Sequence, residues 1–253
     1  MTGKEINLTI NLQFFHNKLV SYLDSHLIAL QSTIRSIQDD SFNSSKMKNI
    51  GVMQMSMLIP TPEILKQQEI NKCFKACVSS LQDFMDNLIG IINMCKSDIR
   101  PDKVLTGREE VEKFLQKTQD KFIQDIARDK NLKVRNKLDM LKVDNPTIRK
   151  MLDGYFSIRN SIEHHKNITD RDVELIYREF KFLAGDIEIK TLPFRAPENT
   201  GITMRAEDVT RTIRKNSLIE ISEIEIENII QTIKILIAVY MTEEASKVKN
   251  KSV

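Results

Sequence analysis

Glycine and proline are scarce in this sequence, with 7 and 6 residues among 253. Turns that need a positive or a fixed φ depend on these two residues, so the chain has few such turns and a sheet of many strands is disfavoured. Long helices are favoured instead. The hydrophobic content of 41% suffices for one or two domains with a real core, which excludes a disordered or fibrous chain.

An excess of charge of one sign is also missing. The sequence has 38 Lys and Arg residues against 35 Asp and Glu residues, a formal net charge of +3. Any site for a polyanion must therefore be local. No stretch is apolar over the length of a membrane span, and Lys4, Glu5 and Asn11 interrupt the apolar run that a signal peptide would need. We therefore expect a cytoplasmic protein that makes no contact with a membrane.

Cysteine is rare as well, with 3 residues that lack the spacing of a disulfide framework. Cys77 and Cys95 belong to one series of apolar residues at helical spacing. We interpret them as buried free thiols that act as small hydrophobic side chains. We expect neither a cofactor nor a bound metal.

Helical periodicity is the strongest pattern present. It predicts a long N-terminal helix of about eight turns, followed by a methionine-rich loop over residues 40–60. We therefore assign residues 1–60 to this helix and loop, and residues 61–253 to the main helical domain. The apolar face of the first helix consists of Leu8, Leu12, Phe15, Leu19, Leu23, Leu30, Ile34 and Ile37, with His26 packed on the same side.

Two start signals open the main domain. Thr61 followed by Pro62 predicts a helix that runs to about Lys96. Thr106 with Glu109 fits a capping box and predicts a second helix, antiparallel to the first. The apolar face of the second helix would consist of Val111, Phe114 or Leu115, Phe122 and Ile126.

The next segments give mixed signals. Residues 131–143 either extend the preceding helix or form a shorter one, and Pro146 opens a further helix. A capping box at Thr169–Asp172 then predicts a helix whose apolar positions include Val173, Ile176, Phe180 and Leu183.

The C-terminal part predicts a loop and a last helix. Residues 186–208 break the helical pattern and alternate in places as a short β-hairpin does. Ser222 with Glu225 forms another capping box before an amphipathic helix. The expected class is all-α, a helical bundle with one long N-terminal helix and a small hairpin between residues 186 and 208.

One helix face carries a group of polar residues of types that occur in catalytic sites. With Arg159 at 0° and about 100° per residue, Glu163, Asn160 and His164 fall at about 40°, 100° and 140°. The apolar stripe of the same helix lies on another side and consists of Ile148, Met151, Tyr155, Ile158 and Ile162.

These residue types suit cleavage of RNA without a metal. A histidine exchanges protons near neutral pH, and an arginine grips a phosphate through two parallel hydrogen bonds. RNA supplies its own nucleophile, the 2′-hydroxyl, so a proton carrier and a cation at the phosphate suffice. The neighbouring His164 and His165 lack the further histidine at i+4 that would complete a zinc pattern.

The segment Arg159-Asn160-Ser161-Ile162-Glu163-His164 resembles the signature of HEPN-domain proteins, in which an arginine and a polar residue precede a histidine. In that family the motif lies at the end of a bundle helix, a capped helix follows, and two protomers join their motifs in one cleft. Many members are metal-independent ribonucleases of toxin–antitoxin, abortive-infection and other antiphage systems. Others are inactive scaffold or nucleotide-binding modules. The resemblance covers residues 61–245.

The resemblance implies a role for each matching residue. His164 would be the general acid/base, Arg159 the phosphate clamp and Asn160 the residue that positions them, with Glu163 and His165 as auxiliary candidates. It implies RNA as substrate, a homodimer, and an antitoxin or sensor protein as a further partner. The candidate contacts to the RNA backbone are Arg149, Lys150, Lys166 and Arg171.

Two further expectations complete the hypothesis. Phe156 falls near about 60° on the same wheel, within the polar sector, where an aromatic residue would line the dimer cleft. The alternative function is a catalytically silent helical module that binds a partner protein or a nucleotide as a scaffold.

Overall fold

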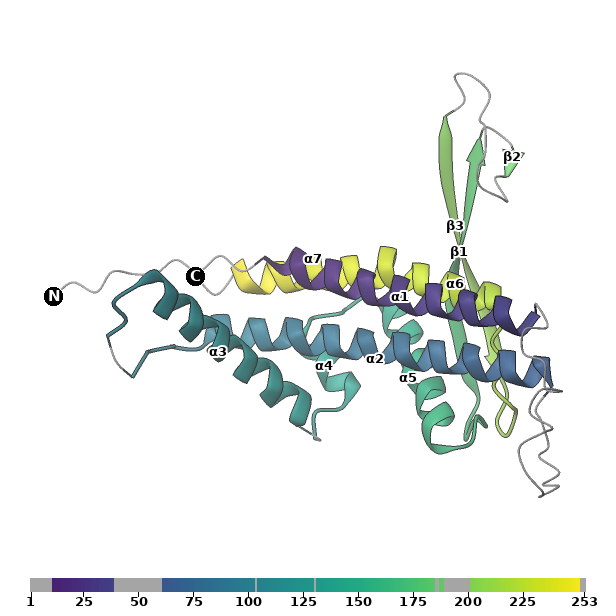
Figure 1. Cartoon of the computed structure of the whole chain (residues 1–253), viewed down its shortest axis with the longest axis horizontal. Coiled ribbons are helices and arrows are strands. Elements are labelled where there is room, and N and C mark those ends of the chain that lie inside the picture. The colour runs from purple at the N-terminus through teal and green to yellow at the C-terminus, as the bar shows by residue number, and fades with distance from the viewer. Residues whose placement is uncertain are drawn as a thin grey trace, which may run out of the picture. The chain divides into compact units, whose positions relative to one another are not determined.

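A computed structural model of the chain describes residues 11–38, 61–102, 104–129, 131–184, 187–188 and 201–250. These residues are mostly helical, as predicted, and include a three-stranded antiparallel sheet (Figure 1). None of the helices among them is both long and apolar enough to cross a membrane. The chain divides into two compact units: unit 1 comprises residues 1–22, 80–145 and 236–253, and unit 2 comprises residues 23–79 and 146–235.

The two longest helices confirm the sequence prediction. α1 spans Leu12–Gln38 and α2 spans Pro62–Lys96, and each contributes residues to both units. At the start of α2 the Thr61 hydroxyl accepts a hydrogen bond from the backbone N–H of Ile64 at 3.4 Å. Local capping chemistry thus marks where α2 begins. Leu8 and residues 40–60 lie outside the described residues.

Unit 1 is built around the C-terminal part of α2, which packs against α3 (Arg108–Arg128). A Cβ atom on Gly90 would lie only 2.8 Å from the Cα of Ile123, so the two helix backbones approach closely. Residues 131–143 do not extend α3, because they contain a separate short helix, α4 (Val134–Met140). Unit 1 also receives α7 (Ala238–Asn250).

The start of α3 corrects one prediction. Gly107 is the N-cap, and no side chain caps the helix. The Thr106 backbone N–H and hydroxyl both donate to the carboxylate of Glu110, at 2.9 and 3.2 Å, and not to that of Glu109. The capping box is therefore wrong in detail although the helix is present. None of the residues of α3 is fully buried.

Unit 2 contains the sheet and the helices that cover it. The sheet order is β2-β1-β3, with β1 at Val173–Ala184, β2 at Ile187–Glu188 and β3 at Ile202–Ile213. β1 and β3 pair along their whole lengths, from Val173 opposite Ile213 to Ala184 opposite Ile202 (Figure 1). α5 (Pro146–His164) and α6 (Glu223–Thr232) both pack on β1, and a π-helical turn (Ile233–Ile237) follows α6.

The core of unit 2 lies where α5, α6 and the first half of β1 meet. Leu175 of β1 and Ile158 of α5 are fully buried there. The ring of Tyr155 meets that of Phe74 edge-on at a centroid distance of 6.2 Å, and burial raises the pKa of the Tyr155 phenol. The backbone N–H of Arg178 donates to the hydroxyl of Thr232 at 2.8 Å, which joins β1 to α6.

The predicted helix after Thr169 is wrong, because residues 173–184 form strand β1. The Thr169 hydroxyl does not cap a helix: it donates to the carbonyl oxygen of Arg214 at 2.5 Å. Val173, Leu175 and Tyr177 alternate along one face of the strand and are buried, as is Ile176 on the other face. The expected hairpin is therefore much longer than residues 186–208, of which 186 and 189–200 are outside the described residues.

Candidate functional site

The polar group predicted from the sequence lies at the C-terminal end of α5. Four of the five predicted apolar positions of this helix are buried, with Ile148, Met151, Tyr155 and Ile158 all at 1% exposure or less, whereas Ile162 is half-buried. The helix ends at His164, and the next turn places Lys166 and Asn167 at φ values of 53° and 65°. Both His165 and Asn167 donate their backbone N–H groups to the carbonyl oxygen of Ser161, at 3.0 and 3.3 Å. This turn closes the helix directly after the motif.

Glu163 is the centre of the group. Its Oε2 lies 3.0 Å from Nη2 of Arg159 and 3.9 Å from Nε2 of His164. Its Oε1 lies 3.6 Å from Nζ of Lys75, which comes from α2. One carboxylate thus brings together two cations and an imidazole. Arg159 and His164, which the helical wheel placed in one sector with Glu163, both contact its carboxylate.

Arg159 is the most enclosed cation of this group, with a side chain 24% exposed. Its Nη1 donates to Oδ1 of Asn160 at 3.3 Å. Its Nε is buried and has no hydrogen-bond partner among the described residues. The edge formed by Nε and Nη2, with which an arginine grips an oxyanion bidentately, is therefore only half used.

His164 is the most accessible member, with a side chain 64% exposed. A solvent-facing imidazole at the end of a helix can exchange protons with a bound substrate. His165 and Lys166 are exposed too, and they lie in the turn after the helix. They flank the group without a contact of their own to Glu163 among those found in the described residues.

Lys75 is the site residue that sequence reasoning missed. It lies on α2, whereas Arg159, Asn160, Glu163 and His164 all belong to α5. No spacing in the sequence indicates a contact between residues 75 and 163. Only the packing of α2 beside α5 within unit 2 brings its ammonium group to the carboxylate.

The other basic candidates lie elsewhere or have other partners. Arg149 and Lys150 stand ten and nine residues before Arg159, about 14–15 Å away along α5 at a rise of about 1.5 Å per residue. The ammonium group of Lys150 lies 2.5 Å from a carboxylate oxygen of Glu174. Arg171 donates from Nη2 to the hydroxyl of Ser157 at 2.5 Å. The structure therefore does not gather these side chains around His164.

The expectation for Phe156 is wrong. Its side chain is 6% exposed in the single chain, so it belongs to the core of unit 2 and is not displayed beside the polar group. α5 packs between neighbours on more than one side, which a helical wheel does not show.

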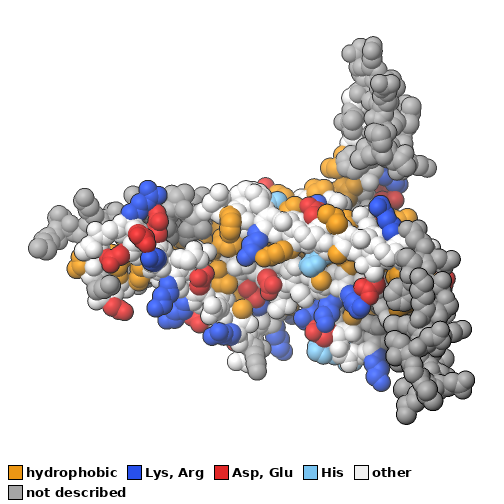
Figure 2. All heavy atoms as spheres, viewed as in Figure 1, with side chains coloured by type: hydrophobic (Ala, Val, Ile, Leu, Met, Phe, Trp, Pro, Cys, Tyr) orange, Lys and Arg blue, Asp and Glu red, His pale blue; other side chains and the backbone are white. Residues whose placement is uncertain are grey.

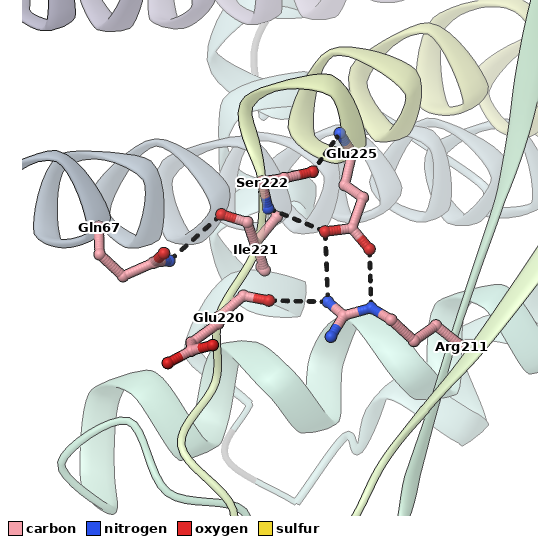
Figure 3. A network of polar contacts seen from close by, with 6 residues as sticks. All are labelled: Gln67, Arg211, Glu220, Ile221, Ser222 and Glu225. Carbon is pink, nitrogen blue, oxygen red and sulfur yellow. Dashed lines mark hydrogen bonds and ion pairs between the residues drawn. The ribbon is translucent and has the colours of Figure 1, made fainter. Parts of the chain in front are cut away.

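A second polar network in unit 2 fixes the connection between β3 and α6 (Figure 3). Nε of Arg211 lies 2.7 Å from the Glu225 carboxylate, and Nη2 of Arg211 donates to the carbonyl oxygen of Glu220 at 2.8 Å. Ser222 and Glu225 complete the predicted capping box, which is confirmed. Gln67 of α2 donates to the carbonyl oxygen of Ile221 at 3.3 Å. The network contains no histidine, and its hydrogen bonds link the end of β3, the start of α6 and α2.

A groove of about 520 Å³ lies beside this network. Ile70, Ile221 and Ile224 provide its apolar part, and Lys66 forms an ion pair with Glu223 at its edge. None of the residues of the Glu163 group lines it.

The described residues contain no group of three or more His, Cys, Asp and Glu side chains placed to hold a metal ion. On the face drawn in Figure 2, acidic and basic side chains of the described residues are interspersed. The formal net charge of +3 is small, so any anion site on this chain must be local.

Comparison with known proteins identifies no relative: no family model, no curated protein and no solved structure matches the chain.

Proposed function

We propose that the chain is a metal-independent endoribonuclease of the HEPN type that cleaves RNA through attack of the 2′-hydroxyl. The observation that carries this proposal is the group at the end of α5, where Glu163 joins Arg159 to a solvent-accessible His164. The proposal extends to RNA as the substrate and to a toxin or antiphage-defence role. It also includes a homodimer and an antitoxin or sensor protein as partner.

Each residue would have a defined part in the reaction. His164 removes the proton of the 2′-hydroxyl or returns one to the leaving oxygen. Arg159 stabilises the negative charge that develops on the phosphorus centre. Asn160, which accepts a hydrogen bond from Arg159 at 3.3 Å, holds the guanidinium in orientation. No step requires a metal ion.

The fold around the motif differs in one respect from the family pattern. The resemblance implies a capped helix after the motif, whereas strand β1 follows α5. The proposal therefore rests on the residues of α5 and on their geometry. It does not rest on the elements that come after them.

The experiment is incubation of the purified full chain with end-labelled total RNA in EDTA, alongside the variants His164→Ala and Arg159→Ala. We expect cleavage by the wild type and a loss of at least about 100-fold in each variant, the usual scale for general acid–base and oxyanion contributions. Arg108→Ala is the matched control, because Arg108 forms an i,i+4 pair with Glu112 on α3, outside the site. Equal cleavage by all four proteins would contradict the proposal.

A second candidate function is the catalytically silent module that binds a partner protein. It is favoured by α3, which has an amphipathic sequence yet none of its residues fully buried. Apolar side chains that remain half-accessible on a helix are typical of protein-binding faces. The same RNA experiment separates the two functions, because a silent module leaves RNA intact in every lane.

A further inference from the structure

The strongest unexplained feature of the molecule is the position of Glu163 among basic groups. Its two carboxylate oxygens meet Lys75 at 3.6 Å, Arg159 at 3.0 Å and His164 at 3.9 Å. Lys75 and Arg159 come from different helices, α2 and α5. An ordinary i,i+4 pair would need only Arg159, so the arrangement has more positive charge than one carboxylate balances.

Arg159 also has a hydrogen-bond donor that Glu163 does not satisfy. Its Nη2 contacts Glu163, but the neighbouring Nε is buried and unpaired among the described residues. A buried donor without a partner costs free energy, and an anion that reached both Nε and Nη2 would satisfy it. A phosphate, with two unesterified oxygens in a phosphodiester, matches this edge of the guanidinium.

We propose that Glu163 occupies a phosphate-binding position formed by Lys75, Arg159 and His164, and that a phosphate of the ligand displaces its carboxylate. The ligand class is a phosphodiester or inorganic phosphate. Its assignment to the RNA backbone rests on the proposed function, whereas the anion site itself does not. Glu163 then acts as an internal competitor, and Lys75 is a further phosphate-contacting residue.

The competition has a predictable strength. The side chain of Glu163 is 28% exposed and that of Lys75 is 44% exposed, so water screens the charges and each contact has a modest effect. Replacing the carboxylate with an uncharged amide leaves both cations free for the incoming phosphate. Charges about 4 Å apart in a water-like medium then account for about a fivefold gain in affinity.

The test is a titration of the full chain with inorganic phosphate and with a DNA oligonucleotide, which lacks the 2′-hydroxyl and is not cleaved by this chemistry. The imidazole signal of His164, identified in NMR spectra by its absence from His164→Ala, reports binding at this position. We expect Glu163→Gln to bind both ligands about fivefold more tightly than the wild type. Lys75→Ala should bind them more weakly, and added salt should weaken binding in every variant.

Glu69→Gln and Lys72→Ala are the matched controls, because Glu69 and Lys72 form an ion pair on α2 and neither is among the described partners of Glu163. Both should bind phosphate as the wild type does. Unchanged or weaker binding by Glu163→Gln would overturn the proposal and make Glu163 a residue that only links α2 to α5. If thermal unfolding shows that Glu163→Gln is not folded, phosphate binding by Lys75→Ala is the deciding measurement. Unchanged binding by Lys75→Ala would then overturn the proposal.

The result is separable from the ribonuclease activity. Tighter phosphate binding by Glu163→Gln without RNA cleavage by any variant would support the anion site and reject the proposed function. RNA cleavage by the wild type together with unchanged phosphate binding by Glu163→Gln would support the proposed function and reject the anion site.

Discussion

A lysine and an aspartate are paired in the core of unit 1. Nζ of Lys137 lies 2.5 Å from Oδ1 of Asp86, and both side chains are 4% exposed. Burial raises the pKa of the Asp86 carboxyl, and the hydrogen bond from Lys137 opposes this shift. A buried pair of this kind adds little net stability but is costly to break, because the remaining charge is left without compensation.

We therefore predict that Lys137→Met lowers the free energy of unfolding by about 3–5 kcal/mol. The double variant Lys137→Met/Asp86→Leu should recover most of the loss, because it removes both charges. Chemical denaturation followed by circular dichroism measures both values. The matched control is Lys113→Met, since the pair of Lys113 with Glu109 on α3 is exposed and should contribute less than about 1 kcal/mol. A loss of similar size in the double variant would contradict this account.

At the residue scale, the sequence predicted the contacts that lie within one helix and missed those between helices. Arg159, Glu163 and His164 lie within about one and a half turns of the same helix, so the wheel placed them together, and their contacts agree with it. Lys75 is far away in sequence, and its contact with Glu163 depends on tertiary packing. The burial of Phe156 depends in the same way on its surroundings in three dimensions.

At the scale of elements, local signals predicted most of the helices and a hairpin, but they missed strand β1. α2 starts at Pro62 and α6 starts after Ser222, because capping chemistry is encoded within a few residues. The apolar positions of 173–183 fit the helical period as well as the alternation of a strand. These residues form a strand because they pair with β3. The paired residues lie up to 40 positions apart in sequence, as Val173 and Ile213 do.

The interface between α5 and β1 gives a prediction at this scale. A Cβ atom on Gly154 would collide with the carbonyl oxygen of Glu174, because the helix and the strand backbone are in close contact there. We expect Gly154→Ala to lower the free energy of unfolding by about 1–3 kcal/mol, the usual cost of overpacking. Gly201→Ala is the control, since nothing lies within 4 Å of its added Cβ, and its stability should be unchanged. Equal stability of the two variants in denaturant titrations would show that the interface accommodates a methyl group.

At the scale of the whole molecule, composition predicted the class and left the detail open. Few glycines and prolines indicated long helices, which the described residues confirm. The near balance of acidic and basic residues indicated that any anion site must be local, and the proposed site consists of a few side chains in contact with Glu163. The strand after α5 separates this chain from the arrangement that the HEPN resemblance implies. The functional proposal therefore rests on the residues at the end of α5 and not on the fold around them.

The chemistry of the RNA product ends tests that central claim most directly. After incubation of total RNA with the full chain in EDTA, mass spectrometry identifies the groups at the new ends. Attack by the 2′-hydroxyl, with His164 as proton carrier, leaves 2′,3′-cyclic phosphates and 5′-hydroxyls, and this is the predicted result. New 3′-hydroxyls with 5′-phosphates would show that water and not the ribose is the nucleophile, and would contradict the account.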